Sequence, residues 1–200
     1  MAGHYFSRRP EAPERRGLLR CRLRGLEFEF VTSSGVFSPR ALDQGARLLV
    51  ESMIIPERGA VLDVGCGYGP VGIAAARIRP GLEVWMTDVN ERAIALAEEN
   101  VRRNRVGDVI VRQGDLYEPV GDAVFTAILS NPPISAGMRR VVEPLVGGAV
   151  DRLLGGGSLQ LVVQSNKGGR ALASMMEGYF GGVEVVARGG GYRVLMSVKG

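Results

Sequence analysis

Residues 60–70 read Ala-Val-Leu-Asp-Val-Gly-Cys-Gly-Tyr-Gly-Pro, a stretch that changes character twice within a few positions. Ala60–Val64 is short and almost wholly apolar, which is typical of a parallel strand buried on both faces. Three glycines then alternate with other residues between Gly65 and Gly69, and Pro70 follows where a helix can begin. Because glycine lets the backbone approach a ligand closely, we expect a buried strand, a ligand-binding loop and a helix in that order.

The rest of the chain repeats this alternation of strand and helix. Apolar runs predict strands at residues 27–31, 60–64, 82–87, 109–111, 123–129, 159–163, 183–187 and 193–198. Helical spacing and capping residues predict helices that start at Ser38-Pro39, Pro70, after Asn90, near Arg139 and at Ala171. We expect Gly155-Gly156-Gly157 to stop the fourth helix. The alternation predicts an α/β fold with a doubly wound, mostly parallel sheet, helices on both faces and right-handed crossovers.

Charge divides the chain unevenly. The 200 residues, 46% of them hydrophobic, suit one globular domain. Residues 1–25 carry seven Arg and two Glu, a balance of +5, whereas residues 26–200 carry 18 basic and 19 acidic groups, a balance of −1. We therefore separate a basic N-terminal segment, residues 1–25, from a folded domain, residues 26–200. A basic segment on a near-neutral body is typical of proteins that contact a polyanion such as RNA.

The scarcity of histidine and cysteine excludes several kinds of chemistry. His4 is the only histidine, and Cys21 and Cys66 are the only cysteines. These residues do not make a Ser-His-Asp or Cys-His nucleophile or a zinc site. No apolar stretch typical of a secretory signal follows the N-terminal arginines, and no apolar run approaches 18 residues. We expect a cytoplasmic protein that uses no metal ion and does not associate with a membrane.

An acidic residue follows each of three successive strands. Asp63 lies in the glycine loop, Asp88 ends the next strand, and Asp115 follows the third. Ligands of open α/β sheets bind at the carboxyl ends of the strands, so the three carboxylates should face one ligand. Asp88 can accept both hydroxyls of a ribose, and Asp115 can accept the amino hydrogens of an adenine. Asp63 suits the sulfonium and ammonium cations of S-adenosylmethionine.

Two cofactors compete for this loop. Residues 67–72 match the dinucleotide fingerprint G-x-G-x-x-G, and Asp88 lies 21 residues after Gly67, so a nicotinamide enzyme is an alternative. A pyrophosphate would be repelled by Asp63, and a dinucleotide site does not need three acids, which favours S-adenosylmethionine. The predicted cofactor-binding residues are Asp63, Gly65, Cys66, Gly67, Tyr68, Gly69, Asp88, Val89, Asn90, Asp115, Leu116 and Asn131.

The residues Asn131-Pro132-Pro133-Ile134 follow the strand predicted at 123–129. Two prolines fix two φ angles and remove two N–H donors, which leaves the Asn131 side-chain oxygen and the Pro132 carbonyl as rigid acceptors. By accepting both hydrogens of an exocyclic amino or amide group, they can aim its lone pair at an electrophilic methyl. The predicted catalytic residues are Asn131, Pro132, Pro133 and Ile134.

With these motifs, residues 26–200 resemble class I S-adenosylmethionine-dependent methyltransferases, and within them the small-domain ribosomal RNA guanine-N2 methyltransferases. Further matching stretches are Phe37-Ser38-Pro39, Leu42-Asp43, Gly114-Asp115-Leu116-Tyr117 and Gly191-Tyr192-Arg193-Val194-Leu195. The resemblance implies a seven-stranded sheet with an antiparallel last strand. It also implies that S-adenosylmethionine is the cofactor, that structured RNA of the ribosome is the partner and that guanine N2 is the methylated atom.

The chain departs from the family pattern after Asn-Pro-Pro-Ile. The family has Arg and later Lys where this chain has Ser135 and Met138, and Arg139 or Arg140 can replace the second charge. An aliphatic residue at the position of Ile134, in place of an aromatic one, is implied by the resemblance to go with methylation of guanine N2 more than of adenine N6. Four alternatives remain open: the same chemistry on a protein glutamine amide, on DNA adenine N6, a nicotinamide oxidoreductase, and a catalytically silent RNA-binding relative.

Overall fold

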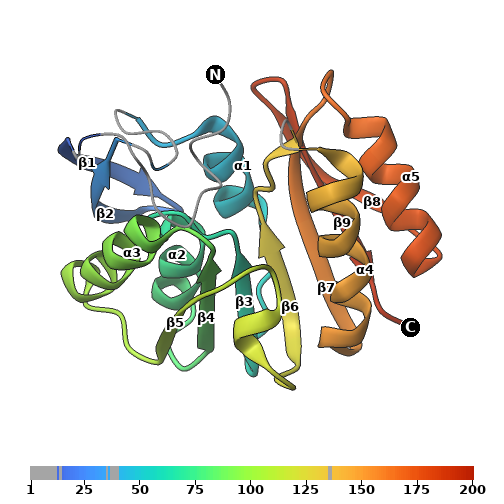
Figure 1. Ribbon diagram of the computed structural model, residues 1–200, viewed down its shortest axis with the longest axis horizontal. Coiled ribbons are helices and arrows are strands. Elements are labelled where there is room, and N and C mark those ends of the chain that lie inside the picture. Colours follow the sequence, from blue (N-terminus) through green and yellow to red (C-terminus); the bar gives the residue numbers. More distant parts are fainter. Residues whose placement is uncertain (1–12, 14, 35, 37–40, 135–136) are drawn as a thin grey trace.

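The computed structural model describes residues 13, 15–34, 36, 41–134 and 137–200 (Figure 1). The strands are β1 Arg16–Leu23, β2 Leu26–Ser33, β3 Ala60–Val64, β4 Glu83–Asp88, β5 Val109–Gln113, β6 Phe125–Ser130, β7 Leu153–Gln164, β8 Glu184–Gly189 and β9 Tyr192–Val198. The helices are α1 Gln44–Ser52, α2 Pro70–Ile78, α3 Glu91–Asn104, α4 Glu143–Arg152 and α5 Gly169–Phe180. A 3-10 turn at Glu118–Val120 and a π-helical turn at Met138–Val142 precede β6 and α4 respectively.

Seven strands form one sheet in the order β5-β4-β3-β6-β7-β9-β8. The pairs from β5 to β7 are parallel, and β9, the last strand in the chain, runs antiparallel to both of its neighbours. This confirms the predicted doubly wound, mostly parallel sheet with an antiparallel last strand. The chain moves outward from β3 to β5 and then returns to the other side of β3 with β6, so the strand order reverses between β3 and β6. Open α/β sheets bind their ligands at such a point.

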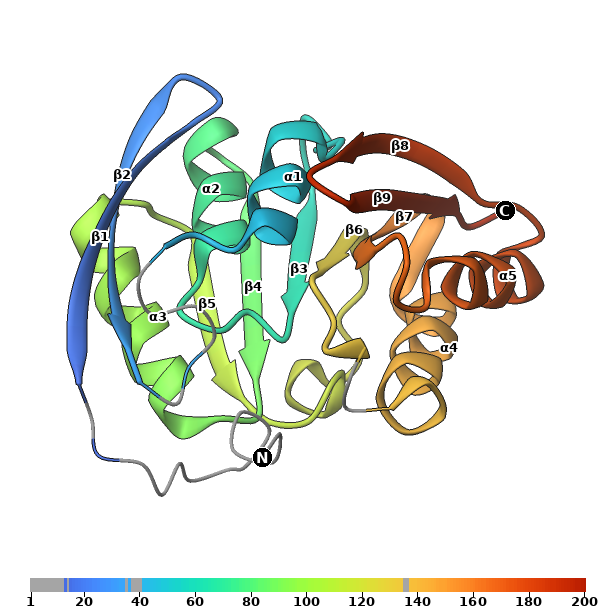
Figure 2. The same cartoon turned by 90° about the horizontal axis from the view of Figure 1, so that it is seen from above.

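Helices cover both faces of the sheet, as predicted (Figure 2). Successive side chains of a strand point to opposite faces, so each strand contributes to two cores. Val61 and Leu129 pack with α1, α2 and α3, whereas Leu62 and Ile128 pack with α4 and α5. The sheet is therefore a rigid layer, and its carboxyl edge, where the predicted site residues lie, is held from both sides.

The starts of α1, α4 and α5 differ from the prediction. Helix α4 begins at Glu143, after the π-helical turn, instead of near Arg139, and α5 begins at Gly169 instead of Ala171. Helix α1 begins at Gln44, and its N-cap is Asp43, whose side chain accepts a hydrogen bond from the Ala46 N–H at 2.9 Å. The predicted start at Ser38-Pro39 lies outside the described residues. The starts of α2 at Pro70 and of α3 after Asn90 are as expected, because Asn90 accepts hydrogen bonds from the N–H groups of Arg92 and Ala93.

The prediction that Gly155-Gly156-Gly157 stops the fourth helix is wrong. Helix α4 ends at Arg152, and β7 runs through the three glycines. Their backbone joins the sheet, because the Gly156 N–H donates to the Lys199 carbonyl and the Lys199 N–H donates to the Gly157 carbonyl. The register between β6 and β7 shifts at this place, and a Cβ on Gly157 would lie 2.9 Å from the Leu154 carbonyl oxygen. Glycine here permits a β-bulge with close backbone approach.

Residues 16–33 form a hairpin that the sequence did not predict as a unit. β1 pairs with β2 from Arg16↔Ser33 to Leu23↔Leu26, so the boundary predicted at residue 25 falls in the hairpin turn. The hairpin packs along α3 at one end of the molecule (Figure 2), where Asn100 exchanges two hydrogen bonds with the Val31 backbone. The sequence did not predict β1 because its side chains are mostly exposed, and its arginines interrupt the alternation of apolar and polar residues that is typical of a half-buried strand.

The positive charge of the N-terminal segment is concentrated in this hairpin. Residues 1–14 carry two Arg and two Glu, so the whole excess of +5 lies in residues 15–25. Arg16 pairs with Glu99 on α3, and Arg20 pairs with Glu29 on β2. Part of this basic charge therefore forms ion pairs within the protein that hold the hairpin in place, and it is less available to bind a polyanion.

Candidate active site

The loops after β3 and β6 lie next to each other at the carboxyl edge of the sheet. The two strands are paired in parallel with Asp63 opposite Leu129. The Ser130 hydroxyl at the end of β6 donates to the Val64 carbonyl at 2.6 Å, which joins the two strand ends. The structure thus brings together the predicted cofactor loop, residues 65–69, and the predicted catalytic residues 131–134.

The glycine loop needs glycine because of its backbone conformation. Gly65, Gly67 and Gly69 have φ values of 71°, 59° and 91°, in the left-handed region that other residues rarely adopt. A Cβ on Gly65 or Gly67 would meet nothing within 4 Å, so space is not the constraint at these two positions. The N–H groups of Gly65 and Cys66 donate to the Thr87 carbonyl, which holds the loop over the end of β4.

Asp88 ties the glycine loop to the start of α3. Its Oδ2 accepts a hydrogen bond from the Gly67 N–H at 2.8 Å, and its Oδ1 accepts one from the Asn90 N–H at 2.9 Å. Burial raises the pKa of this carboxyl above its ordinary value. Each carboxylate oxygen has a second lone pair, so Asp88 can still accept ribose hydroxyls. Its structural role was not predicted from the sequence.

Asp63 lies beneath the loop instead of lining an open surface. The side chain is 1% exposed, and its Oδ2 accepts a hydrogen bond from the Gly72 N–H in the first turn of α2 at 2.9 Å. Burial raises the pKa of Asp63 to about 7. Its carboxyl therefore anchors α2. Because it is buried, Asp63 can influence a cofactor cation only by its charge and not by direct contact at the surface.

We expect Asp63→Asn to remove a pH dependence of stability in the absence of cofactor. A carboxyl with a raised pKa binds its proton more tightly in the folded chain, so its stabilising contribution is complete below about pH 4 and is lost as the pH rises to about 7. The loss is at most about 1.4 kcal/mol per pH unit. In urea unfolding at pH 5, 6, 7 and 8, the free energy of unfolding of the variant should rise relative to that of the wild type as the pH rises. Asp151→Asn, an exposed change on α4, is the control, and parallel curves for Asp63→Asn and wild type would refute the expectation.

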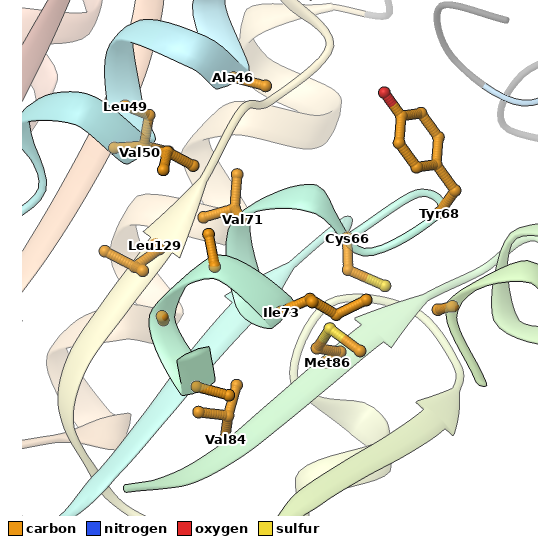
Figure 3. Packing of buried hydrophobic residues seen from close by; sticks show 14 of the residues in the cluster. Ala46, Leu49, Val50, Cys66, Tyr68, Val71, Ile73, Val84, Met86 and Leu129 are labelled. Atoms are coloured by element: carbon orange, nitrogen blue, oxygen red, sulfur yellow. The ribbon is translucent and has the colours of Figure 1, made fainter. Parts of the chain in front are cut away.

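Cys66 and Tyr68 place their side chains in the core. They are 5% and 3% exposed. In Figure 3 the Cys66 thiol points toward Ile73 and Met86, whereas the Tyr68 ring points away from them. That ring packs against Phe30 at a centroid distance of 5.7 Å. Neither side chain is therefore open to a cofactor, and the Cys66 N–H and the Tyr68 carbonyl are already bonded to Thr87 and Asn100.

The remaining predicted cofactor residues follow β4 and β5 as neighbours. The Gly114 N–H donates to the Asp88 carbonyl at 3.1 Å, which brings the 114–116 turn beside Asp88 and Val89. Asp115 is exposed at this turn, and Leu116 is half-buried with a φ of 46°. Asn90 is 2% exposed and acts as the cap of α3.

The Asn-Pro-Pro loop holds its acceptors differently from the prediction. The Asn131 amide nitrogen Nδ2 donates to Asp43 Oδ2 at 2.8 Å. The Pro132 carbonyl, predicted to be free, accepts a hydrogen bond from the Ile134 N–H at 2.9 Å and keeps one lone pair. No described residue donates a hydrogen bond to Asn131 Oδ1. The loop therefore offers one amide oxygen and one carbonyl lone pair at the strand end.

The start of α5 adjoins this loop, a contact that the sequence did not predict. A Cβ on Gly168 would lie 2.9 Å from Met138 Cε and 3.0 Å from Ile134 Cγ2. Lys167 and Arg170, on either side of this glycine position, are exposed. Two cations thus stand near the loop although the sequence lacks the family's Arg and Lys after Ile134. Ser135 lies outside the described residues.

A groove leads away from the loop between the π-helical turn and α5. Its volume is about 630 Å³, and its lining residues are Met138, Arg139, Glu143, Ser174, Met175, Gly178 and Tyr179. Arg139 is exposed, and Tyr179 is 46% exposed. Guanidinium and aromatic side chains of this kind bind phosphates and unpaired bases of RNA.

The part of the chain that the structure describes holds no group of three His, Cys, Asp or Glu side chains placed to bind a metal ion. Within the same residues, no helix is both long and apolar enough to cross a membrane.

Comparison with known proteins shows that residues 27–196 match the methyltransferase small domain family. The uncharacterized Bacillus subtilis (strain 168) protein YbxB is 38% identical over 201 residues, which cover 100% of both chains. The ribosomal RNA small subunit methyltransferase C of Erwinia tasmaniensis is 33% identical over 177 residues, which cover 86% of this chain and 50% of that protein. The chain thus spans the full length of the first relative and about half the length of the second.

Among solved structures, the T. thermophilus 16S rRNA N2 methyltransferase RsmC, in complex with AdoMet and guanosine, superposes with a TM-score of 0.83. It is 26% identical in sequence, and the match covers 96% of this chain and 52% of that one. A ribosomal protein L11 methylase from Lactobacillus delbrueckii subsp. bulgaricus shares the fold with a TM-score of 0.64 and 22% identity.

Proposed function

The chain belongs to the methyltransferase small domain family, and we propose that it transfers a methyl group to an exocyclic amino nitrogen of structured RNA, namely guanine N2 of ribosomal RNA. The cofactor of this family is S-adenosylmethionine. Membership of a methyltransferase family excludes the nicotinamide oxidoreductase that the glycine fingerprint left open.

The observation that carries the proposal is the orientation of Asn131. Its amide nitrogen is bound to Asp43, so its oxygen is the end left for a substrate. This oxygen and the remaining lone pair of the Pro132 carbonyl are two acceptors on one rigid loop, which matches an NH2 group with two hydrogens to donate. The loop stands beside the glycine loop that would hold the methyl donor.

The residues of the chain fit a mechanism of positioning. Bound S-adenosylmethionine would supply an electrophilic methyl, and the electrons of the broken C–S bond would stay on the sulfur of the departing thioether. Asn131 Oδ1 and the Pro132 carbonyl draw the amino hydrogens toward the protein, which turns the nitrogen lone pair out of the ring conjugation and toward the methyl. The nitrogen can release its proton to water after transfer, so no histidine base is needed.

Two features support RNA as the substrate over a protein glutamine or DNA. The groove beside the loop presents Arg139 and Tyr179, and Lys167 and Arg170 stand at the start of α5. The Erwinia tasmaniensis relative is named as a ribosomal RNA small subunit methyltransferase, and RsmC was solved with guanosine. Tritiated methyl transfer into a cell extract tests this: the label should vanish on ribonuclease treatment, and label lost only to protease or deoxyribonuclease would refute it.

We expect the combined change Arg139→Gln and Lys167→Gln to weaken RNA binding and flatten its salt dependence. Each lost phosphate contact should lower the slope of log K against log salt by about 0.7 to 0.9. Fluorescence anisotropy with a small-subunit RNA fragment, titrated at several salt concentrations, measures this slope.

The matched control is Arg16→Gln with Arg20→Gln, which also removes two charges. These arginines are paired with Glu99 and Glu29, so the slope should change less. A larger change in the control would move the RNA contact to the basic hairpin that the charge distribution first suggested.

A further inference from the structure

Asp43 makes two hydrogen bonds through one oxygen. Its Oδ2 accepts from the Ala46 N–H at 2.9 Å and from Asn131 Nδ2 at 2.8 Å. The first bond caps α1, and the second reaches a residue 88 positions further along the chain. The half-buried carboxyl therefore links the start of α1 to the loop after β6.

The chemistry of a carboxylate decides how Asn131 is oriented. An ionised carboxylate carries only acceptors, whereas the two ends of an amide differ, one donating and one accepting. The carboxylate must therefore face the NH2 end of Asn131. The reverse orientation would place two oxygens against each other and would present NH2 to a substrate that also donates.

We propose that Asp43 is a positioning residue for methyl transfer, which fixes the Asn131 amide with its oxygen toward the substrate amine and polarises that oxygen by its negative charge. This role rests on the proposed function. It adds a residue that makes no contact with the reacting atoms and acts through Asn131.

Helix capping alone does not account for this arrangement. A cap needs one acceptor for the first turn, and Ser or Thr supplies it as well as Asp. Here the side chain also accepts a hydrogen bond from Asn131 Nδ2, and because Ser Oγ stands one bond closer to the backbone than Asp Oδ2, we expect a Ser at this position to lose that bond.

The surroundings of Asp43 are closely packed at Gly45. A Cβ on this buried helical glycine would lie 2.9 Å from Asp43 Oδ2 and 3.0 Å from Tyr192 Cε1. The Tyr192 hydroxyl accepts a hydrogen bond from Gln164 at 2.8 Å, which holds the ring in place. Glycine is a poor helix former, so its presence in the first turn of α1 fits a need for room around the carboxyl.

Three substitutions separate positioning from capping. Asp43→Asn keeps an oxygen that can cap Ala46 and accept from Asn131, and it removes the charge. Asp43→Ser keeps a cap and is expected to lose the bond to Asn131. Asp43→Ala removes both bonds. Asp151→Ser on the exposed face of α4 is the control for loss of an acid.

We expect kcat for methyl transfer to small-subunit RNA to fall about 100-fold in Asp43→Ser, as a misplaced reacting group costs, while KM for RNA and Kd for S-adenosylmethionine stay at wild-type values. Asp43→Asn should recover most of this loss, about tenfold or more, and Asp43→Ala should match Asp43→Ser in kcat with a lower melting temperature. Wild-type kcat in Asp43→Ser would overturn the proposal and leave Asp43 as a cap.

A second measurement does not depend on activity. The Asn131 NH2 signals in a 1H–15N spectrum, assigned by their absence in Asn131→Asp, should move in Asp43→Ser and stay near their wild-type position in Asp43→Asn. Unmoved signals in Asp43→Ser would overturn the positioning role. A wild-type chain that methylates no RNA while these signals behave as expected would instead refute the proposed function.

Discussion

Asn131→Ala is expected to lower kcat for methyl transfer about 100- to 1,000-fold, the usual cost of removing one preorganised polar group from a transition state. The substitution deletes the amide oxygen that would hold the substrate amine and removes one of the two hydrogen bonds that Asp43 Oδ2 accepts. Cofactor affinity should change only a few-fold, because the glycine loop and Asp88 bond to each other and to Thr87 without Asn131. Single-turnover methyl transfer and calorimetric titration with S-adenosylmethionine measure the two effects separately.

The control for this variant is Asn166→Ala. Asn166 is the same residue type, is exposed, and lies on the turn after β7 at the same edge of the sheet. Its kcat should stay at the wild-type value. If Asn131→Ala lost cofactor binding as strongly as turnover, Asn131 would belong to the cofactor site first, as its place among the predicted cofactor-binding residues also allows.

Asp88→Ala is expected to weaken S-adenosylmethionine binding about 100-fold. A hydrogen bond to a charged group contributes about 1.5–3 kcal/mol, and two lost ribose contacts reach the roughly 3 kcal/mol that corresponds to this factor. The same change releases the Gly67 N–H from its acceptor, so the melting temperature of the cofactor-free protein should also fall.

Calorimetry on Asp88→Ala and Asp88→Asn distinguishes the two roles of this carboxyl. Asp88→Asn keeps one oxygen and should lose less affinity than Asp88→Ala. Asp151→Ala on α4 should bind the cofactor as the wild type does. An unchanged Kd in Asp88→Ala would remove Asp88 from the ribose and leave it as the tie between the glycine loop and α3.

The parts of the fold that the sequence predicted well are those in which one local rule decides the structure. Ala60–Val64 is apolar except for Asp63 because both of its faces are buried, and the φ values of Gly65, Gly67 and Gly69 need glycine. Asn90 caps α3 by a bond to residues only two and three positions away. Such signals depend on neighbours in the chain, so they can be interpreted without knowledge of the fold.

The parts that the sequence did not predict depend on partners that are distant in the chain. Gly155-Gly156-Gly157 follows a helix, as a stop signal would, and only its pairing with Lys199 places it in the sheet. Leu42-Asp43 matches a family motif, but the sequence assigned no role to it. The contact of Asp43 with Asn131 forms only when the start of α1 packs beside the end of β6. The net charge of residues 15–25 follows directly from the sequence. The pairing of Arg16 with Glu99 and of Arg20 with Glu29 could not be predicted, because it depends on how the hairpin folds and packs against α3.

The proposed reaction is methylation of the amino group of a guanine in ribosomal RNA, with that group held by the Asn131 loop. The most direct test is mass spectrometry of nucleosides from unmodified small-subunit RNA incubated with the protein and labelled S-adenosylmethionine. We expect labelled N2-methylguanosine with the wild type and about 100- to 1,000-fold less with Asn131→Ala. Label in N6-methyladenosine instead, or equal labelling by the variant, would contradict it.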